Sequence, residues 1–182
     1  MLFDTPVCDF GWKAPDFELR DPSGAAFRMS DHLGDKGLLV AFICNHCPYV
    51  KAIADRLAAD AAALMSEGVN VLAVMSNDYR SVPADAPPRM QEFAARHGFP
   101  FPYLIDADQS VGRAWGAVCT PDFFGLNSDG ALQYRGRLDD ARMGDASTRT
   151  PELLQAMRLI AKTGKGPQQQ VASMGCSIKW AA

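Results

Sequence analysis

The hydrophobic pattern in the middle of the chain predicts two buried strands joined by a helix. Residues 38–43 and 69–75 are nearly uninterrupted apolar runs, as in strands that are buried on both faces. Between these runs, apolar residues recur at helical spacing from Val50 to Met65, and Gly68 ends the pattern. A helix that connects two buried strands makes a β-α-β unit, which requires the strands to run parallel.

Alternating and turn-forming residues predict further elements on either side of this unit. Residues 16–29 alternate around the turn Asp21-Pro22-Ser23-Gly24, which predicts a β-hairpin. Downstream, the pattern predicts a helix from about Asp85 to Gly98, a strand at 102–105, a short helix at 109–115, a hairpin of 123–126 with 132–137, and a last helix capped by Thr150 and ended by Gly164. This order predicts an α/β fold with a central mixed β-sheet flanked by helices.

Residues 165–182 differ in character from the domain that we predict for residues 1–164. They are polar at first and then end in an apolar sequence that contains Ile178 and Trp180. We expect a C-terminal tail that docks through these two side chains and is not part of the core.

The composition indicates one globular domain and excludes several function classes. The chain has 182 residues, of which 48% are hydrophobic and 21% are charged, which is enough apolar material for a substantial core. The net charge is −3 and Lys and Arg do not cluster, so we expect no nucleic-acid binding. No apolar run approaches the ~20 residues of a membrane span, so we expect no membrane association.

The N-terminus and the cysteine count favour a cytoplasmic location. The segment from Met1 to Pro6 has neither the basic nor the apolar region of a secretory signal. The chain has five cysteines, and an odd number argues against a secreted disulfide framework. Catalytic thiols in a reducing cytoplasm agree better with this count.

The sequence Cys44-Asn45-His46-Cys47 lies where the first buried strand gives way to the helix. A C-x-x-C at such a junction is typical of a dithiol redox site. We expect both cysteines in the first helical turn, where free backbone N–H groups and the helix dipole favour the thiolate. The alternative is half of a zinc site, but zinc usually takes four ligands and the other Cys and His residues are scattered. We therefore expect a redox site that needs no metal and no prosthetic group.

Several motifs together resemble the thioredoxin superfamily. They are the β-α-β unit with its C-x-x-C, a Thr-Pro before a β-β-α ending, the opening Gly11-Trp12-Lys13-Ala14-Pro15-Asp16-Phe17-Glu18-Leu19, the segment Cys119-Thr120-Pro121-Asp122-Phe123-Phe124 and the terminal Gly175-Cys176-Ser177-Ile178-Lys179-Trp180. The opening is similar to the peroxiredoxin (AhpC/TSA) and TlpA-like branch, and the combination is similar to peroxiredoxin-like proteins with a C-N-H-C centre. The resemblance implies a thioredoxin-like fold with an N-terminal β-hairpin extension.

The resemblance also implies roles for the residues that match. Cys44 would attack a substrate disulfide, and Cys47 would resolve the mixed disulfide. Thr120 and Pro121 would form a cis peptide bond that positions the substrate backbone, which is chemically permitted before proline. His46, by analogy with the more oxidising members of the superfamily, would stabilise the Cys44 thiolate. The alternative for His46 is an exposed side chain without a partner.

Two departures from the family patterns limit what the resemblance implies. Ala41 takes the place of a buried Asp that assists proton transfer in thioredoxins, so another group must take the proton. The peroxiredoxin pattern P-x-x-x-T-x-x-C is also broken, because counting back from Cys47 places Cys44 at the Thr position and Val40 at the Pro position. Counting back from Cys44 reaches Ala41 and Gly37 instead.

Several other residues each have a functional and a structural interpretation. Arg135 or Arg137 could take the role of the peroxiredoxin arginine, but we favour solvated strand arginines, because Arg is mostly a surface residue. The acidic pair Asp139-Asp140 is interpreted as a solvated turn or helix cap and not as a metal or acid pair. Tyr49 could shape an apolar rim for the substrate, but a contact with the core is favoured.

Two further cysteines could be accessory thiols. Cys119 lies two residues before Pro121 and is either a third redox thiol or, as we favour, a small buried side chain. Cys176 lies in the predicted tail, where it either exchanges with Cys44 or another subunit or only packs the tail. The sequence leaves these two interpretations of Cys176 open.

The leading hypothesis from the sequence is a thiol-disulfide oxidoreductase. Its expected partners are a disulfide-containing protein or a small thiol or peroxide substrate, together with a thiol electron donor that the sequence does not identify. One alternative is a peroxiredoxin-like thiol peroxidase. The other is a non-enzymatic dithiol redox sensor, in which oxidation moves the tail that carries Cys176.

Overall fold

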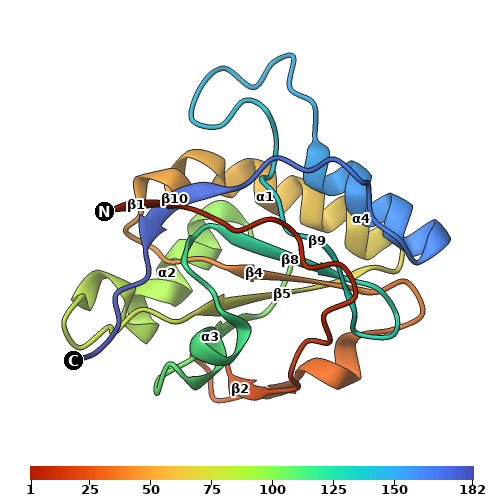
Figure 1. Cartoon of the computed structure of the whole chain (residues 1–182). Helices are drawn as coiled ribbons and strands as arrows, with labels where there is room; N and C mark the ends of the chain where they lie inside the picture. Colours follow the sequence, from red (N-terminus) through yellow and green to blue (C-terminus); the bar gives the residue numbers. More distant parts are fainter.

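A computed structural model describes all residues from 1 to 182 and shows a central sheet with helices on both faces (Figure 1). The sheet has seven strands in the order β3-β2-β6-β5-β4-β8-β9. In chain order these strands are β2 (Glu18–Arg20), β3 (Ala26–Arg28), β4 (Leu38–Phe42), β5 (Asn70–Met75), β6 (Tyr103–Ile105), β8 (Asp122–Leu126) and β9 (Leu132–Tyr134). The α-helices are α1 (Pro48–Ser66), α2 (Pro87–His97), α3 (Ser110–Trp115) and α4 (Glu152–Thr163), and two short 3₁₀ turns are η1 (Met29–His32) and η2 (Pro83–Asp85).

The β-α-β unit predicted from the two apolar runs is confirmed. Strands β4 and β5 pair in parallel, and α1 connects them. On its other side, β4 pairs antiparallel with β8, so the sheet is mixed and every residue of β4 is buried. The antiparallel pairing of β2 with β3 confirms the N-terminal hairpin predicted for residues 16–29.

Alternate side chains of β4 enter two separate cores, because successive residues of a strand point to opposite faces of the sheet. Leu39 and Ala41 belong to a cluster of 27 buried residues that includes the inner faces of α1, α2 and α4. Leu38, Val40 and Phe42 belong to a cluster of 15 buried residues that includes side chains of α3. Figure 1 shows the same layering, with α1 and α4 on one side of the sheet and α3 on the other.

The two ends of the chain meet in a small second sheet that the sequence pattern did not predict. Its strands are β1 (Leu2–Asp4), β10 (Met174–Ser177) and β7 (Cys119–Thr120), in the order β1-β10-β7. Ile178, directly after β10, is buried in the second core cluster, and Trp180 packs against that cluster. The expectation of a tail outside the core is therefore wrong for Ile178. A strand this short has no recognisable period, and its pairing depends on segments that are distant along the chain.

The start of the last helix also differs from the prediction. Helix α4 begins at Glu152, and Pro151 occupies the cap position without a side-chain capping hydrogen bond. Thr150 lies outside the helix, where its backbone N–H donates to Asp140 Oδ1 at 2.7 Å. Thr150 is thus held by the preceding loop and does not cap the helix.

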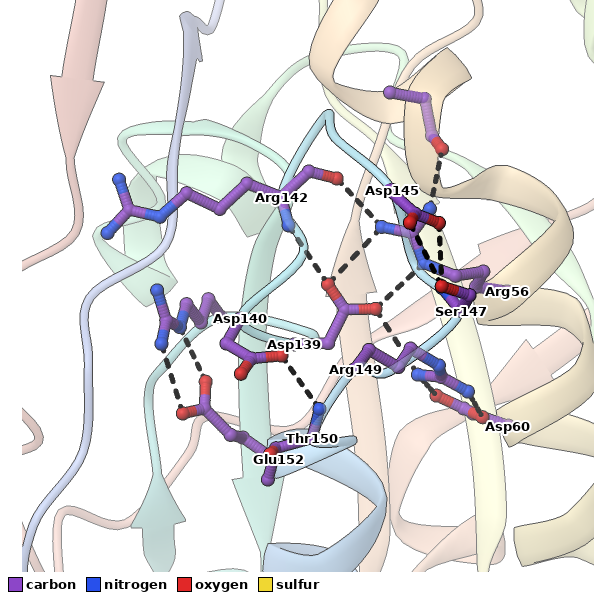
Figure 2. Close-up of polar contacts among 12 residues, drawn as sticks. Arg56, Asp60, Asp139, Asp140, Arg142, Asp145, Ser147, Arg149, Thr150 and Glu152 are labelled. Atoms are coloured by element: carbon purple, nitrogen blue, oxygen red, sulfur yellow. Dashed lines mark hydrogen bonds and ion pairs between the residues drawn. The ribbon is translucent and has the colours of Figure 1, made fainter.

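A polar network ties the loop between β9 and α4 to helix α1 (Figure 2). Asp139 is buried and accepts hydrogen bonds from Arg56 (Nε, 2.7 Å) and Arg149 (Nη1, 3.3 Å). Arg149 also forms an ion pair with Asp60 of α1 at 2.6 Å. The prediction of a solvated acidic turn is therefore wrong for Asp139, because Arg56 of α1 and Arg149 of the same loop neutralise it. Asp140, in contrast, is exposed.

None of the helices has both the length and the apolar composition that a bilayer span requires. Helix α1 has 19 residues, but charged residues interrupt its apolar face. The cytoplasmic location expected from the sequence stays a prediction.

Candidate active site

The C-N-H-C sequence connects β4 to α1 at the end of the central strand. The helix begins at Pro48, whose ring fixes φ and lacks a backbone N–H, so that proline suits the first helical position. Cys47 is therefore the N-cap residue, and Cys44 lies in the loop before it. The expectation that both cysteines lie in the first helical turn is wrong. Pro48 was the sequence signal that marks the true start of the helix.

Both thiols are buried against the segment that contains Thr120 and Pro121. Cys44 and Cys47 are each 0% exposed. Cys44 Sγ lies 3.3 Å from Thr120 Oγ1, and Cys47 Sγ lies 3.3 Å from the main-chain oxygen of Thr120. The Thr120–Pro121 peptide bond is cis, as the resemblance implies. The structure therefore brings these four residues together at one site.

The surroundings of the two thiols favour a negative charge on Cys47. A hydrogen bond from the Cys44 thiol is the largest cause that lowers the pKa of Cys47, and donors on Cys176 and Val50 add to it, so that the pKa falls from 9.0 to about 4 although burial opposes the shift. The N-terminus of α1 acts in the same direction. The pKa of Cys44 is well above its ordinary value, because Cys44 keeps its proton in the hydrogen bond to Cys47 and is buried near Asp85.

A buried carboxylate, Asp85, organises the C-N-H-C loop. Asp85 ends η2 and is 0% exposed. It accepts hydrogen bonds from the backbone N–H groups of Asn45 (2.8 Å) and His46 (3.3 Å) and from the side chain of Asn77 (2.9 Å). Burial raises the pKa of Asp85, but hydrogen bonds from His46, Asn77 and Asn45 outweigh burial and hold the pKa below its usual range.

Sequence reasoning missed this role of Asp85, which it interpreted only as part of a helix start. Asp85 and His46 are 39 positions apart, so no local spacing connects them. The carboxylate reaches the loop only because α2 and the turn before it pack beside the start of α1. An isolated Asp before a Pro-Pro sequence gives no signal of such a contact.

His46 is paired, and the alternative of an exposed histidine without a partner is wrong. Its Nδ1 lies 2.6 Å from Asp85 Oδ2, and this hydrogen bond raises the pKa of His46, although burial offsets part of the effect. The charge of Cys47 raises the pKa of His46 further. By reciprocity, a charged His46 stabilises the Cys47 thiolate, whereas the sequence analysis expected it to act on Cys44.

Replacing Asp85 by Asn tests this arrangement. Asp85→Asn removes the charge and keeps the size of the side chain, so the pKa of His46 should fall, because Asp85 is its largest raising cause. NMR titration of the His46 imidazole measures the change. Asp55→Asn is the matched control, because Asp55 is the partner of His97. This substitution should leave the pKa of His46 unchanged. An unchanged pKa of His46 in Asp85→Asn would contradict the pairing.

Cys44, His46 and Asp85 also have the chemistry of metal ligands. One ligand atom of each residue lies within 4.8 Å of the other two. Structural zinc sites use four ligands, and this set offers three. A cation would also have to replace the 2.6 Å hydrogen bond between His46 and Asp85. His46 and Asp85 are hydrogen-bonded to each other, and Cys44 lies beside this pair.

The two arginine candidates are both engaged in ion pairs. Arg135 is buried, bonds Asp122 through Nη2–Oδ2 (2.9 Å) and Nε–Oδ1 (3.2 Å), and lies 4.3 Å from the centre of the Phe124 ring. Arg137 holds Glu152, at the start of α4, through two hydrogen bonds. The expectation of a solvated strand arginine is wrong for Arg135, because the chain supplies a buried carboxylate that requires a cation.

The structure separates the two candidate accessory thiols. Cys119 is buried, its thiol donates to the main-chain oxygen of Pro121 at 3.6 Å, and burial next to the Asp122 charge raises its pKa. These observations favour the structural interpretation of Cys119. Cys176 is only half-buried, and its thiol forms a hydrogen bond with Cys47. Cys176 therefore lies beside the C-N-H-C loop.

A pocket of about 430 Å³ opens beside the centre. Its lining includes Tyr49 and Ile53 of α1, Pro121, and Leu138 from the segment after β9. Tyr49 is half-buried and packs against the core, which confirms the favoured core contact. Its role in shaping a rim for the substrate stays a prediction. Val50, the next residue, is fully buried in the core.

The fold recurs in solved structures. The crystal structure of an uncharacterized conserved protein from Geobacillus kaustophilus matches with a TM-score of 0.93 and 37% identity, covering 100% of this chain and 97% of the other. A hypothetical protein from Sinorhizobium meliloti 1021 matches with a TM-score of 0.90 and 39% identity, covering 98% of each chain. Both similarities extend over the central sheet and the terminal segments alike.

A curated relative with a described activity matches over a smaller part of the chain. The thiol-disulfide oxidoreductase ResA of Geobacillus thermodenitrificans (strain NG80-2) is 28% identical over 130 residues, which are 68% of this chain and 66% of ResA. The chain thus spans just under two thirds of the length of that relative. This similarity supports redox activity in general.

A family model covers the central part of the chain, including the site. Residues 10–135 match the AhpC/TSA family, a range that contains the C-N-H-C loop, Asp85 and the cis-proline. The narrower group with a C-N-H-C centre stays a prediction. Because this match covers more than half of its length, the chain belongs to the AhpC/TSA family, within the peroxiredoxin-like part of the thioredoxin superfamily.

Proposed function

We propose that this protein is a thiol-disulfide oxidoreductase in which Cys47 is the nucleophile and Cys44 is the resolving thiol. The observation that carries the proposal is the position of Cys47 at the N-cap of α1, with the Cys44 thiol as a hydrogen-bond donor to it. Disulfide exchange proceeds through the thiolate, and Cys47 is the group of this pair that holds the charge. The proposal reverses the roles that the resemblance implied for the two cysteines.

The reaction consists of two exchanges at the Cys47 sulfur. The Cys47 thiolate first attacks one sulfur of a substrate disulfide, so that a mixed disulfide forms and the first substrate sulfur leaves as a thiolate. Cys44 then loses its proton and attacks Cys47 Sγ, which releases the second substrate sulfur. Cys44 and Cys47 end as a disulfide, and the substrate disulfide has gained two electrons. The two substrate sulfurs leave as thiolates, and Cys44 releases the one proton of the reaction.

His46 and Asp85 are suited to the proton transfer of the second exchange. Ala41 cannot perform it, although it lies where thioredoxins have an acid on the central strand. A ring nitrogen of His46 and a carboxylate oxygen of Asp85 lie within 4.8 Å of Cys44 Sγ. The mixed disulfide removes the Cys47 charge that raises the pKa of His46. We propose that His46 then gives up its proton to solvent and that this pair receives the Cys44 proton. Tyr103 supports the geometry, because its hydroxyl donates to Asn45 Oδ1 at 2.8 Å inside the same loop.

Cysteine variants test the assignment of roles. In the reduced double variant Cys44→Ala/Cys176→Ala, a small peptide disulfide should form a stable mixed disulfide on Cys47, because no neighbouring thiol remains to resolve it. In Cys47→Ala, neither Cys44 nor Cys176 should form an adduct at a comparable rate, because desolvation and the nearby Asp85 charge keep Cys44 protonated and burial raises the pKa of Cys176. Mass spectrometry of acid-quenched samples locates the adduct. An adduct on Cys44 that forms in Cys47→Ala at the wild-type rate would overturn the assignment.

The family membership favours reduction of peroxides by Cys47 as a second candidate function. Cys47 stands at the cysteine position of the pattern P-x-x-x-T-x-x-C. However, Cys44 and Val40 replace the Thr and the Pro, and Arg135 is bound to Asp122. The surroundings of Cys47 thus consist of thiol donors, which supports disulfide exchange as the first candidate. Its substrates and electron donor stay predictions.

A further inference from the structure

The register of the small second sheet directs Cys176 toward the redox centre. Strands β10 and β7 pair antiparallel, with Cys176 opposite Thr120 and Ser177 opposite Cys119. Directly opposite residues of an antiparallel pair place their side chains on the same face of the sheet. The Thr120 hydroxyl lies 3.3 Å from Cys44 Sγ. The Cys176 side chain therefore projects on the face that carries the C-N-H-C loop.

A glycine allows this close approach of β10. An added Cβ at Gly175 would lie 1.9 Å from the main-chain oxygen of Thr120, so a side chain at this position would push β10 away from the centre. Further contacts hold the strand in place: the Ser173 hydroxyl donates to the Pro121 oxygen at 2.7 Å, and the Ser177 N–H donates to the Met1 oxygen at 2.9 Å. Cys176 is thus held at a defined position and does not lie in a mobile tail.

Cys176 packs against the core cluster that contains Cys44 and Cys47. The closeness of Cys176 also contributes to the lowered pKa of Cys47. Cys44 and Cys47 are completely buried, whereas Cys176 is half-buried. Cys176 is therefore the most exposed of these three cysteines. The two sulfurs must approach to ~2.05 Å to form a disulfide bond.

We propose that Cys176 is a second resolving thiol, which forms a Cys47–Cys176 disulfide and so carries the oxidised state of the buried centre to the surface. The proposal rests on the proposed function and identifies where a thiol electron donor reaches the centre. It names a role for one residue that neither the family pattern nor the C-x-x-C spacing assigns.

The steps of this relay balance. After the first exchange, Cys47 is joined to a substrate sulfur, and the Cys176 thiolate attacks Cys47 Sγ. The Cys47–Cys176 bond forms, the bond to the substrate breaks, and the substrate sulfur leaves and takes up the proton that Cys176 lost. A donor thiol then attacks the Cys176 sulfur, which forms a mixed disulfide there and returns the Cys47 thiolate. A second donor thiol releases the reduced Cys176, and the two donors leave as a disulfide.

The same disulfide can also pass inward. Attack of Cys44 on Cys47 Sγ converts the Cys47–Cys176 disulfide into the Cys44–Cys47 disulfide and frees the Cys176 thiol. The reverse exchange brings the oxidised state outward again. No oxidant or reductant is consumed in this step, because one disulfide replaces another.

Stoichiometry with a chromogenic aromatic disulfide tests the proposal. In a Cys8→Ala/Cys119→Ala background, reduced Cys44→Ala should release two aromatic thiols per chain, the first when Cys47 reacts and the second when Cys176 resolves the adduct. Cys44→Ala/Cys176→Ala in the same background should release one and keep the adduct on Cys47. Peptide mapping of the first variant should show the Cys47–Cys176 disulfide. Cys44→Ala that stops at one equivalent with a stable adduct on Cys47 overturns the proposal.

The outcomes separate this proposal from the proposed function. If neither variant releases an aromatic thiol, the assignment of Cys47 as the nucleophile fails. If both variants release one aromatic thiol per chain, only the role of Cys176 fails. A second readout uses single variants of the wild-type chain, without the Cys8→Ala/Cys119→Ala background. Oxidised Cys176→Ala should be re-reduced by a small thiol at least tenfold more slowly than the wild type, whereas Cys119→Ala, the neighbouring control, should match the wild type. Equal re-reduction of Cys176→Ala and wild type overturns the role at the surface.

Discussion

Reduced protein is expected to lose its Cys47 thiolate only when the pH falls to about 4, whereas an ordinary thiol protonates near its value of 9.0. The physical reason is the set of donors around one sulfur: the Cys44 thiol, the Cys176 thiol and N–H, and the Val50 N–H. The ultraviolet absorbance of the thiolate, recorded against pH, measures the transition. It should be absent from Cys47→Ala.

Two variants measure how much Cys44 and Cys176 each lower the pKa of Cys47. Cys44→Ala removes the hydrogen bond that lowers the pKa of Cys47 most, so the midpoint should move upward; Cys176→Ala should move it upward by less. Cys119→Ala serves as the control, because burial raises the pKa of this thiol and its hydrogen bond goes to the Pro121 oxygen. A midpoint near 9 in the wild type would contradict the assignment of the charge to Cys47.

The same shift makes the stability of the reduced protein depend on pH. The pKa of Cys47 is lower in the folded than in the unfolded state, so its stabilising contribution is fully present above pH 9 and is lost as the pH falls through about 4. The free energy of unfolding of the reduced wild type should therefore decline more across this interval than that of Cys47→Ala. Urea unfolding at several pH values measures the free energy of unfolding of both proteins. The carboxylates contribute equally to both, so their contribution cancels in the difference.

A stabilised thiolate also affects the reduction potential. Stabilisation of the reduced form makes a dithiol a stronger oxidant, as in the more oxidising members of the superfamily. The Cys44–Cys47 couple should consequently have a potential above the about −270 mV of thioredoxin. Equilibration with a glutathione redox buffer gives this value directly, and a potential below that of thioredoxin would argue against a stable Cys47 thiolate.

Arg135→Ala is expected to destabilise the protein by about 3–5 kcal/mol, because the substitution leaves a buried carboxylate without its cation. Asp122 is 0% exposed, and Arg135 holds both of its oxygens. The substitution also removes the contact of the guanidinium with the Phe124 ring and its hydrogen bond to the Gly116 oxygen. Since typical domains are stable by about 5–15 kcal/mol, the loss should be plain in urea unfolding.

Arg137→Ala is the matched control for this prediction. It removes an arginine two positions away whose pair with Glu152 is partly solvated, with side chains 17% and 27% exposed. Solvent screens such a pair, so the expected loss is about 1 kcal/mol or less. Adding Asp122→Asn to Arg135→Ala should recover part of the stability, because the unpaired charge is then absent. Equal losses in Arg135→Ala and Arg137→Ala would contradict the assignment of a buried ion pair.

The fold was predictable where the pattern of the chain is local. The apolar runs of 38–43 and 69–75 and the helical spacing between them correspond to β4, β5 and α1. The hairpin around Asp21-Pro22-Ser23-Gly24 was equally clear. Strands β1, β7 and β10 were missed, because each has at most four residues and is stabilised only by the other two.

Buried charges were harder to predict than the elements that carry them. Asp139 and Arg135 each looked like a residue for the solvated surface, and each is buried against a partner of opposite charge. Nothing in the local sequence distinguishes a carboxylate that forms an ion pair with an arginine from one that is solvated. The partner of Asp139 on α1, Arg56, is 83 positions away.

By itself, the sequence determined that this is an α/β protein with two thiols at the junction of a buried strand and a helix, because periodicity and C-x-x-C spacing are local properties of the chain. Only the tertiary structure decided which thiol carries the charge. Pro48 starts the helix after Cys47, β10 brings the donors of Cys176, and η2 brings Asp85 to the loop. A pKa is the sum of such contacts, and segments that are distant in the sequence supply most of them here.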